Sequence, residues 1–156
     1  MVDMNNVATQ NYRSNVLRFE EKMSNVPGVK FGDLENCPLT HEFCDGLYVR
    51  TIFMPKGMLI VSKIHKHTHP AFILSGKVSV LDEKGIKFVE GPCKFITPAG
   101  TKRVLYTHED TVWTTVHATK ETELTRIEEE VIAKTFDEVD EIGIDKMIKH
   151  ISGGAI

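Results

Sequence analysis

The sequence places three of its seven histidines at alternate positions in one stretch, Ile64-His65-Lys66-His67-Thr68-His69-Pro70. The residues before it, 58–61, and after it, 71–81, are apolar and rich in strand-forming types. Side chains alternate between the two faces of a strand, so an unbroken strand would point His65, His67 and His69 to one side. Imidazole is the commonest protein ligand for zinc, iron, nickel and copper ions. The stretch therefore predicts a metal site on one face of a sheet.

Short strand-like segments separated by turn residues surround these histidines. Turns rich in Gly, Pro, Asp and Glu recur about every eight to twelve residues, a spacing typical of a β-sandwich or barrel, and the number of segments fits a jelly roll. Residues 29–44 contain several turn formers and are expected to be irregular, with His41 at the surface or in a loop. The predicted strands are residues 47–54, 58–63, 72–81, 86–89, 93–97, 102–106 and 111–118.

Both ends of the chain show helical spacing instead. Apolar stripes with this spacing are Tyr12, Val16, Phe19 and Met23 near one end, and Leu124, Ile127 and Val131 near the other. They predict a helix from about residue 9 to the Pro27-Gly28 pair and a second over 121–134. Residues 135–140 look extended, and 142–151 are expected to form a last short helix. We predict one compact domain, with a tail and helix in 1–28, a barrel in 29–119 and a helical extension in 120–156.

Composition narrows the class of protein. The chain has 156 residues and a net charge of −3, so there is no excess of basic residues to favour nucleic acid. No apolar run is long enough to span a bilayer, and the first residues lack a signal-peptide pattern. Cys37, Cys44 and Cys93 are odd in number and form no CxxC pair, which favours reduced thiols. We expect a cytoplasmic protein whose partner is a small molecule, not nucleic acid or a membrane.

Glycines, prolines and histidines around the predicted barrel resemble the two sequence motifs of the cupin superfamily. The two stretches are Gly57-x7-His65-x-His67-x-His69-x6-Gly76 and Gly91-x6-Pro98-x-Gly100-x2-Arg103. The resemblance covers about residues 47–118 and implies a cupin-type β-barrel, a double-stranded β-helix or jelly roll. Family members are often homodimers, and many hold a divalent metal through a His-x-His pair, a Glu and a further His. Residues 98–119 also resemble small cupins encoded by bacteriophages and bacteria, which implies the host cytoplasm for a phage-encoded chain.

The chain departs from the usual cupin ligand set. If Gly76 closes the first motif, His69 replaces the usual Glu, and His67 falls in a hairpin. If His65 and His67 form the His-x-His pair, no ligand follows at the usual distance. Arg103 replaces the histidine of the second motif, so a fourth imidazole would come from His117 or, as a second candidate, from His108. The predicted ligands are His65, His67, His69 and His117, and the ion is zinc, iron, manganese or nickel.

Neutral ligands would keep the bound metal strongly Lewis acidic, because no carboxylate offsets its charge. Such an ion permits hydrolase, lyase or isomerase chemistry, and the resemblance implies dioxygenase chemistry with iron. Arg103 could hold a carboxylate or phosphate, and Tyr106 and Trp113 could stack on a ring, with core packing as the other interpretation of Trp113. We predict a metal-binding protein that acts on a small anionic molecule. The alternatives are a metal-free cupin that binds or sequesters an anionic ligand and a metal-independent sugar-nucleotide epimerase using a His base and Tyr106.

Overall fold

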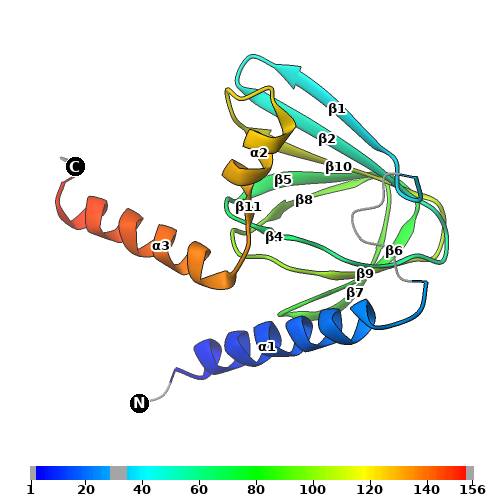
Figure 1. Ribbon diagram of the computed structural model, residues 1–156, viewed down its shortest axis with the longest axis horizontal. Coiled ribbons are helices and arrows are strands. Elements are labelled where there is room, and N and C mark those ends of the chain that lie inside the picture. The colour runs from blue at the N-terminus through cyan, green and yellow to red at the C-terminus, as the bar shows by residue number, and fades with distance from the viewer. Residues whose placement is uncertain (1–2, 29–34, 154–156) are drawn as a thin grey trace.

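Two antiparallel sheets make up the barrel of the computed structural model, which describes residues 3–28 and 35–153 (Figure 1). The first sheet has the order β1 (Leu39–Cys44), β2 (Leu47–Met54), β10 (Thr111–Ala118), β5 (His69–Ser75) and β8 (Cys93–Thr97). The second has the order β3 (Leu59–Val61), β9 (Val104–Thr107), β6 (Lys77–Asp82) and β7 (Gly85–Glu90). A short pair joins β4 (Ile64–His65) to β11 (Ile132–Ala133). The predicted all-β core is confirmed.

Apolar side chains from both sheets fill the space between them. Alternation places every second residue of β10 on the inner face, and Trp113 there packs edge-on against Phe95 with ring centroids 5.3 Å apart. Burial of each large apolar side chain contributes about 1.5–3 kcal/mol. The buried members of this core are Met54, Ala71, Ile73, Val78, Val80, Leu105 and Trp113.

Three helices lie outside the sheets: α1 (Met4–Ser24), α2 (Leu124–Val131) and α3 (Phe136–Ile151) (Figure 1). The first begins earlier than predicted because the carboxylate of Asp3 caps it by accepting a hydrogen bond from the backbone N–H of Asn5. Val16 of α1 packs into a second apolar cluster with Ile64 and Phe136, which joins both ends of the chain to the barrel. No helix within the described ranges is long and apolar enough to cross a membrane.

Several segments differ from the sequence-based expectations. The helix predicted over 121–134 is shorter, because α2 ends at Val131 and residues 132–133 form β11. Of the region 29–44, expected to be irregular, residues 29–34 lie outside the described residues and Leu39–Cys44 forms an edge strand paired with β2. The segment 135–140 was expected to be extended, but it begins α3. The carboxylates of Asp137 and Glu138 occupy the first turn and stabilise the helix by interacting with the positive end of its dipole. The single strand predicted over 72–81 is two strands separated by Gly76.

Gly76 carries the chain from the first sheet to the second. Its φ is +105°, in the region that favours glycine, and the carbonyl oxygen of Asp110 and the Oγ1 of Thr111 each lie 2.5 Å from where a Cβ would be. The crossing therefore passes too close to the start of β10 for any side chain to fit.

Replacing Gly76 with alanine should lower the free energy of unfolding by about 3 kcal/mol or more, because the new methyl group meets backbone as well as adopting a strained φ. Gly85→Ala is the matched control. Its φ is +109°, but nothing lies within 4 Å of the added Cβ, so we expect a loss of about 1–2 kcal/mol. Urea unfolding followed by circular dichroism measures both. Equal losses in the two variants would contradict the role assigned to close approach at Gly76.

Candidate metal centre

Three histidines from three strands meet on the inner side of the barrel wall. His65 ends β4, His69 begins β5, and His117 lies near the end of β10. One nitrogen from each ring can be chosen so that all three atoms lie within 4.8 Å of one another. The ring centroids are 4.7 Å apart for His65 and His69, 4.5 Å for His69 and His117, and 5.8 Å for His65 and His117. We call these three residues the histidine cluster.

Strand alternation, together with the interruption between β4 and β5, explains which histidines meet. His117 shares its face of β10 with the buried Trp113, and His69 shares its face of β5 with the buried Ala71. His65 is brought to them by the pairing of β4 with β11, in which it lies opposite Ile132.

His67 is not part of the histidine cluster. The chain bends at Lys66, whose backbone N–H donates to the carbonyl of Val131 and whose Nζ donates to the carbonyl of Glu129. Alternation along one strand therefore does not hold from His65 to His69, and the His67 side chain is exposed in the bend. The structure matches the alignment in which Gly76 closes the first motif and His67 lies between two strands.

Hydrogen bonds define which ring nitrogens can act as ligands. The Nδ1 of His69 is 2.9 Å from the backbone carbonyl oxygen of His67. Because a carbonyl only accepts, this Nδ1 carries the proton in the neutral ring, and Nε2 keeps the lone pair that a metal needs. The Nε2 of His117 is 3.0 Å from the Oγ1 of Thr115.

Burial keeps the cluster uncharged. It lowers the pKa of His65 to about 3 and that of His117 to about 4, and it also lowers the pKa of His69. The other charged groups that act on His65 are all basic and depress its pKa further: His69, His117, Arg50 and Arg103. Neutral imidazole is the form that binds metal ions, so the site favours the ligand form throughout the physiological range.

Arg50 is a site residue that our sequence analysis missed. It lies on β2, directly opposite Thr115 of β10 and His41 of β1, so its side chain shares the inner face with His117. Its guanidinium makes no hydrogen bond or ion pair to any residue in the described ranges, and burial lowers its pKa. Its position could have been found, because Arg50 interrupts the apolar alternation of Tyr48, Ile52 and Met54.

Arg103 also faces inward. Its neighbour Lys102 points its side chain the opposite way, toward α1. Its Nη1 donates to the Oγ1 of Thr97 at 3.0 Å, and its Cζ lies 5.2 Å from the Phe95 ring centroid. Thr97 is the cross-strand neighbour of His69, so Arg103 lies beside the wall that carries the cluster. Lys102 instead bonds to Glu20 of α1 at 3.0 Å and is only 5% exposed.

The two predicted aromatic contacts lie elsewhere. Trp113 is a core residue. Tyr106 is 43% exposed and lies on the face of β9 opposite to the buried Leu105, with its ring edge-on to His108. The structure therefore does not bring Tyr106 to the histidines, because alternation along this short strand points it outward. A different tyrosine, Tyr48, adjoins the cluster. Its ring stacks on His117, and its hydroxyl oxygen lies 2.7 Å from the Nδ1 of His41.

Comparison with known proteins shows likeness in fold. No family model and no curated protein matches the sequence. Ectoine synthase from P. lautus is 11% identical, with a TM-score of 0.52 over 70% of this chain and 82% of that one. The Cnp3 cupin domain of Schizosaccharomyces pombe is 19% identical, with a TM-score of 0.47 over 67% and 75%. A protein of unknown function from Streptococcus pyogenes is 19% identical, with a TM-score of 0.45 over 63% and 94%.

The lowered pKa values predict that the metal-free protein loses stability as the pH falls. Between pH 6.5 and 5, the histidines of the unfolded chain take up protons that His65 and His117 in the fold do not. The free energy of unfolding should therefore fall with decreasing pH, by up to about 1.4 kcal/mol per pH unit for each proton. Denaturant titrations at several pH values measure this slope.

His65→Asn should make the slope shallower, because one depressed group is removed. His150→Asn is the control for replacing a histidine outside the cluster, because its side chain is exposed on α3. A stability that is constant from pH 6.5 to 5 in the wild type would contradict the neutral, buried cluster.

Proposed function

We propose that this chain, a jelly-roll barrel of the cupin type, binds one divalent metal ion through His65, His69 and His117 and acts on a small anionic molecule. The observation that carries the proposal is the convergence of three imidazole nitrogens, from three separate strands, within 4.8 Å of one another. At this separation, small rotations of the side chains would bring all three nitrogens onto one ion.

The chemistry of the donor set supports a metal. The three rings are held neutral, and the hydrogen bond from His69 Nδ1 to a carbonyl is the kind of outer contact that orients a metal-binding histidine. A ligand set of imidazoles suits zinc, iron or nickel better than manganese, which prefers carboxylates. When bound with three protein ligands, such an ion supplies a Lewis-acid centre with a position open to substrate.

The charges around the cluster support an anionic substrate. Arg50 and Arg103 both act on His65, and no carboxylate belongs to the group of three histidines. A divalent ion would add to this positive charge without an acidic ligand to balance it. The role of the two arginines is then to attract and orient an anion, since buried charge is stable only when it is paired.

The two alternative functions, a metal-free ligand-binding protein and an epimerase, depend on different observations. A metal-free protein that only binds an anionic ligand would use the same two arginines, so metal content decides between it and the proposal. The epimerase hypothesis paired His67 or His69 with Tyr106, and the structure places Tyr106 on the outer face of β9.

Elemental analysis by mass spectrometry of protein purified without a histidine tag or chelator tests the proposal. We expect about one zinc, iron or nickel ion per chain in the wild type, and a loss of most of it in His69→Ala, because that ring is buried in the centre of the cluster. His67→Ala is the matched control from the same stretch and should keep its metal, since His67 lies in the exposed bend.

Circular dichroism would verify that both variants are folded. A wild-type protein that is free of metal and gains no thermal stability when zinc, iron or nickel is added would overturn the proposal. Loss of metal in His67→Ala alone would show that His67, not His69, holds the ion.

A further inference from the structure

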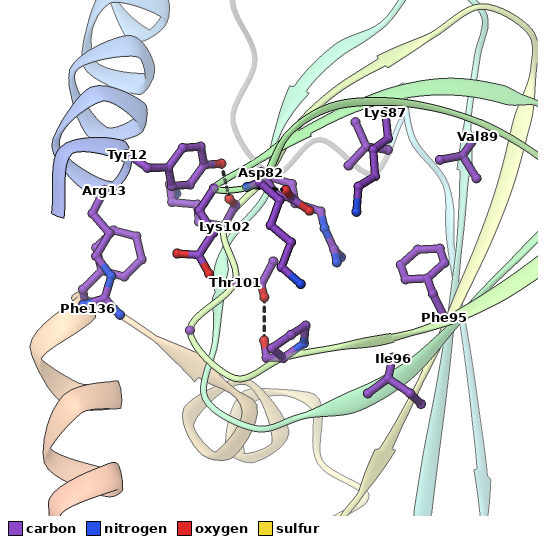
Figure 2. Close-up of a pocket in the computed structure, with 16 residues that line it drawn as sticks. Tyr12, Arg13, Asp82, Lys87, Val89, Phe95, Ile96, Thr101, Lys102 and Phe136 are labelled. Carbon is purple, nitrogen blue, oxygen red and sulfur yellow. Dashed lines mark hydrogen bonds between the residues drawn. The ribbon is translucent and has the colours of Figure 1, made fainter. Parts of the chain in front are cut away.

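A cavity of about 280 Å³ lies between the barrel and the terminal helices, and none of the three clustered histidines lines it (Figure 2). One of its borders is formed by β7 and β8, the edge strands of the two sheets, which are not hydrogen-bonded to each other. Figure 2 shows Lys87 and Val89 on one side of this border and Phe95 and Ile96 on the other. The cavity is slightly smaller than the ~300–1,000 Å³ typical of drug-sized ligands, so it suits a small molecule.

The ion pairs around the cavity leave several basic groups without a partner. Arg13 is paired with Asp140 and Lys102 with Glu20, each at 3.0 Å. The other charged residues that line the cavity form no ion pair within the described ranges: Lys84, Lys87 and Arg103 are basic, and Asp82 and Glu83 are acidic. The balance of unpaired charge is thus positive, and Arg103 is the basic group that faces the barrel interior.

Arg103 has more hydrogen-bond donors than the protein satisfies. A guanidinium carries five N–H groups, and only Nη1 has a partner in the described residues, the hydroxyl of Thr97. Its Nε is buried and has no acceptor. Nη2 has no partner in the described residues either, so the guanidinium keeps unsatisfied donors, and a guanidinium fork matches the spacing of the two oxygens of a carboxylate.

Apolar side chains line the cavity near this guanidinium. Val80 and Val89 come from the paired strands β6 and β7, and Phe95 comes from β8. The Phe95 ring lies against the guanidinium of Arg103, with 5.2 Å between Cζ and the ring centroid, which restrains the direction of the side chain. The lining thus combines one charged fork with a surface that suits a hydrocarbon body.

We infer that this cavity binds a small organic carboxylate, with its two oxygens on Arg103 and its apolar body against Val80, Val89 and Phe95. The inference rests on the proposed function for the anionic character of the ligand and adds its chemical class and its place. Because Thr97 bonds to Arg103 and lies opposite His69, the bound carboxylate lies next to the wall of the metal centre.

Calorimetric titration of benzoate into metal-free protein tests this site. We expect binding that weakens at least tenfold in Arg103→Met and nearly as much in Arg103→Lys, because lysine keeps the charge but lacks the planar fork. Asp82→Asn should bind benzoate several-fold more tightly, since Asp82 stabilises the charge of Arg103 and competes with the ligand for it. Asparagine can still accept the hydrogen bond that Asp82 Oδ1 takes from the backbone N–H of Lys84.

Two further probes separate the interactions. Benzyl alcohol, which has the same ring without the charge, should bind at least tenfold more weakly than benzoate, and inorganic phosphate should also bind more weakly. Equal affinity for the alcohol, tighter binding of phosphate, unchanged affinity in a folded Arg103→Met variant, or no benzoate binding at millimolar concentration would each overturn the inference. If the wild type holds metal but does not bind benzoate in this way, the proposed function stands and the carboxylate site is wrong. If the chain takes up no metal but binds benzoate as expected, the carboxylate site stands and the proposed metal-dependent function is wrong.

Discussion

The constraint on which this structure depends is a group of enclosed basic side chains that form no direct ion pair within the described residues. Three imidazoles and two guanidinium groups share the barrel interior, and the charged groups that act on His65 are all basic. The fold tolerates this arrangement because the imidazoles give up their protons, whereas arginines cannot. The positive charge of the two arginines is what makes an anion the complementary ligand in the proposed function.

The candidate metal centre and the cavity are neighbouring sites that are connected through Thr97 at the end of β8. Thr97 accepts a hydrogen bond from Arg103, which lines the cavity, and is the cross-strand neighbour of His69. The opposite directions of Lys102 and Arg103 make this possible: one side chain fixes helix α1 through Glu20, and the other reaches the interior. The dipeptide Lys102-Arg103 thus contacts helix α1 with one side chain and lines the cavity beside Thr97 with the other.

Alternation within unbroken strands could be predicted from the sequence, and the predicted strands 47–54 and 111–118 are β2 and β10. Trp113 was predicted to stack on a ligand, with core packing as the other interpretation, and it lies in the core. Alternation failed where the backbone leaves the strand. His67 lies in a bend that is fixed by hydrogen bonds from Lys66 to α2, which is distant in sequence. Strand spacing did not predict this bend, whereas the motif alignment that ends at Gly76 did place His67 in a hairpin. Arg50 was missed for another reason: it lies on the inner face of a correctly predicted strand, but only the tertiary structure shows that its guanidinium forms no hydrogen bond or ion pair within the described residues.

The pairing of β4 with β11 connects the C-terminal part of the chain to His65, one of the proposed metal ligands. His65 lies opposite Ile132, and β11 is the only link between α2 and α3, so the strand that carries one proposed ligand is also the strand on which both C-terminal helices are anchored. By thermodynamic linkage, an ion bound to His65 would favour the paired position of β11 to the extent that this pairing favours ion binding. If the proposed ion binds, the order of the C-terminal helices would then depend on it, even though none of their side chains belongs to the histidine cluster.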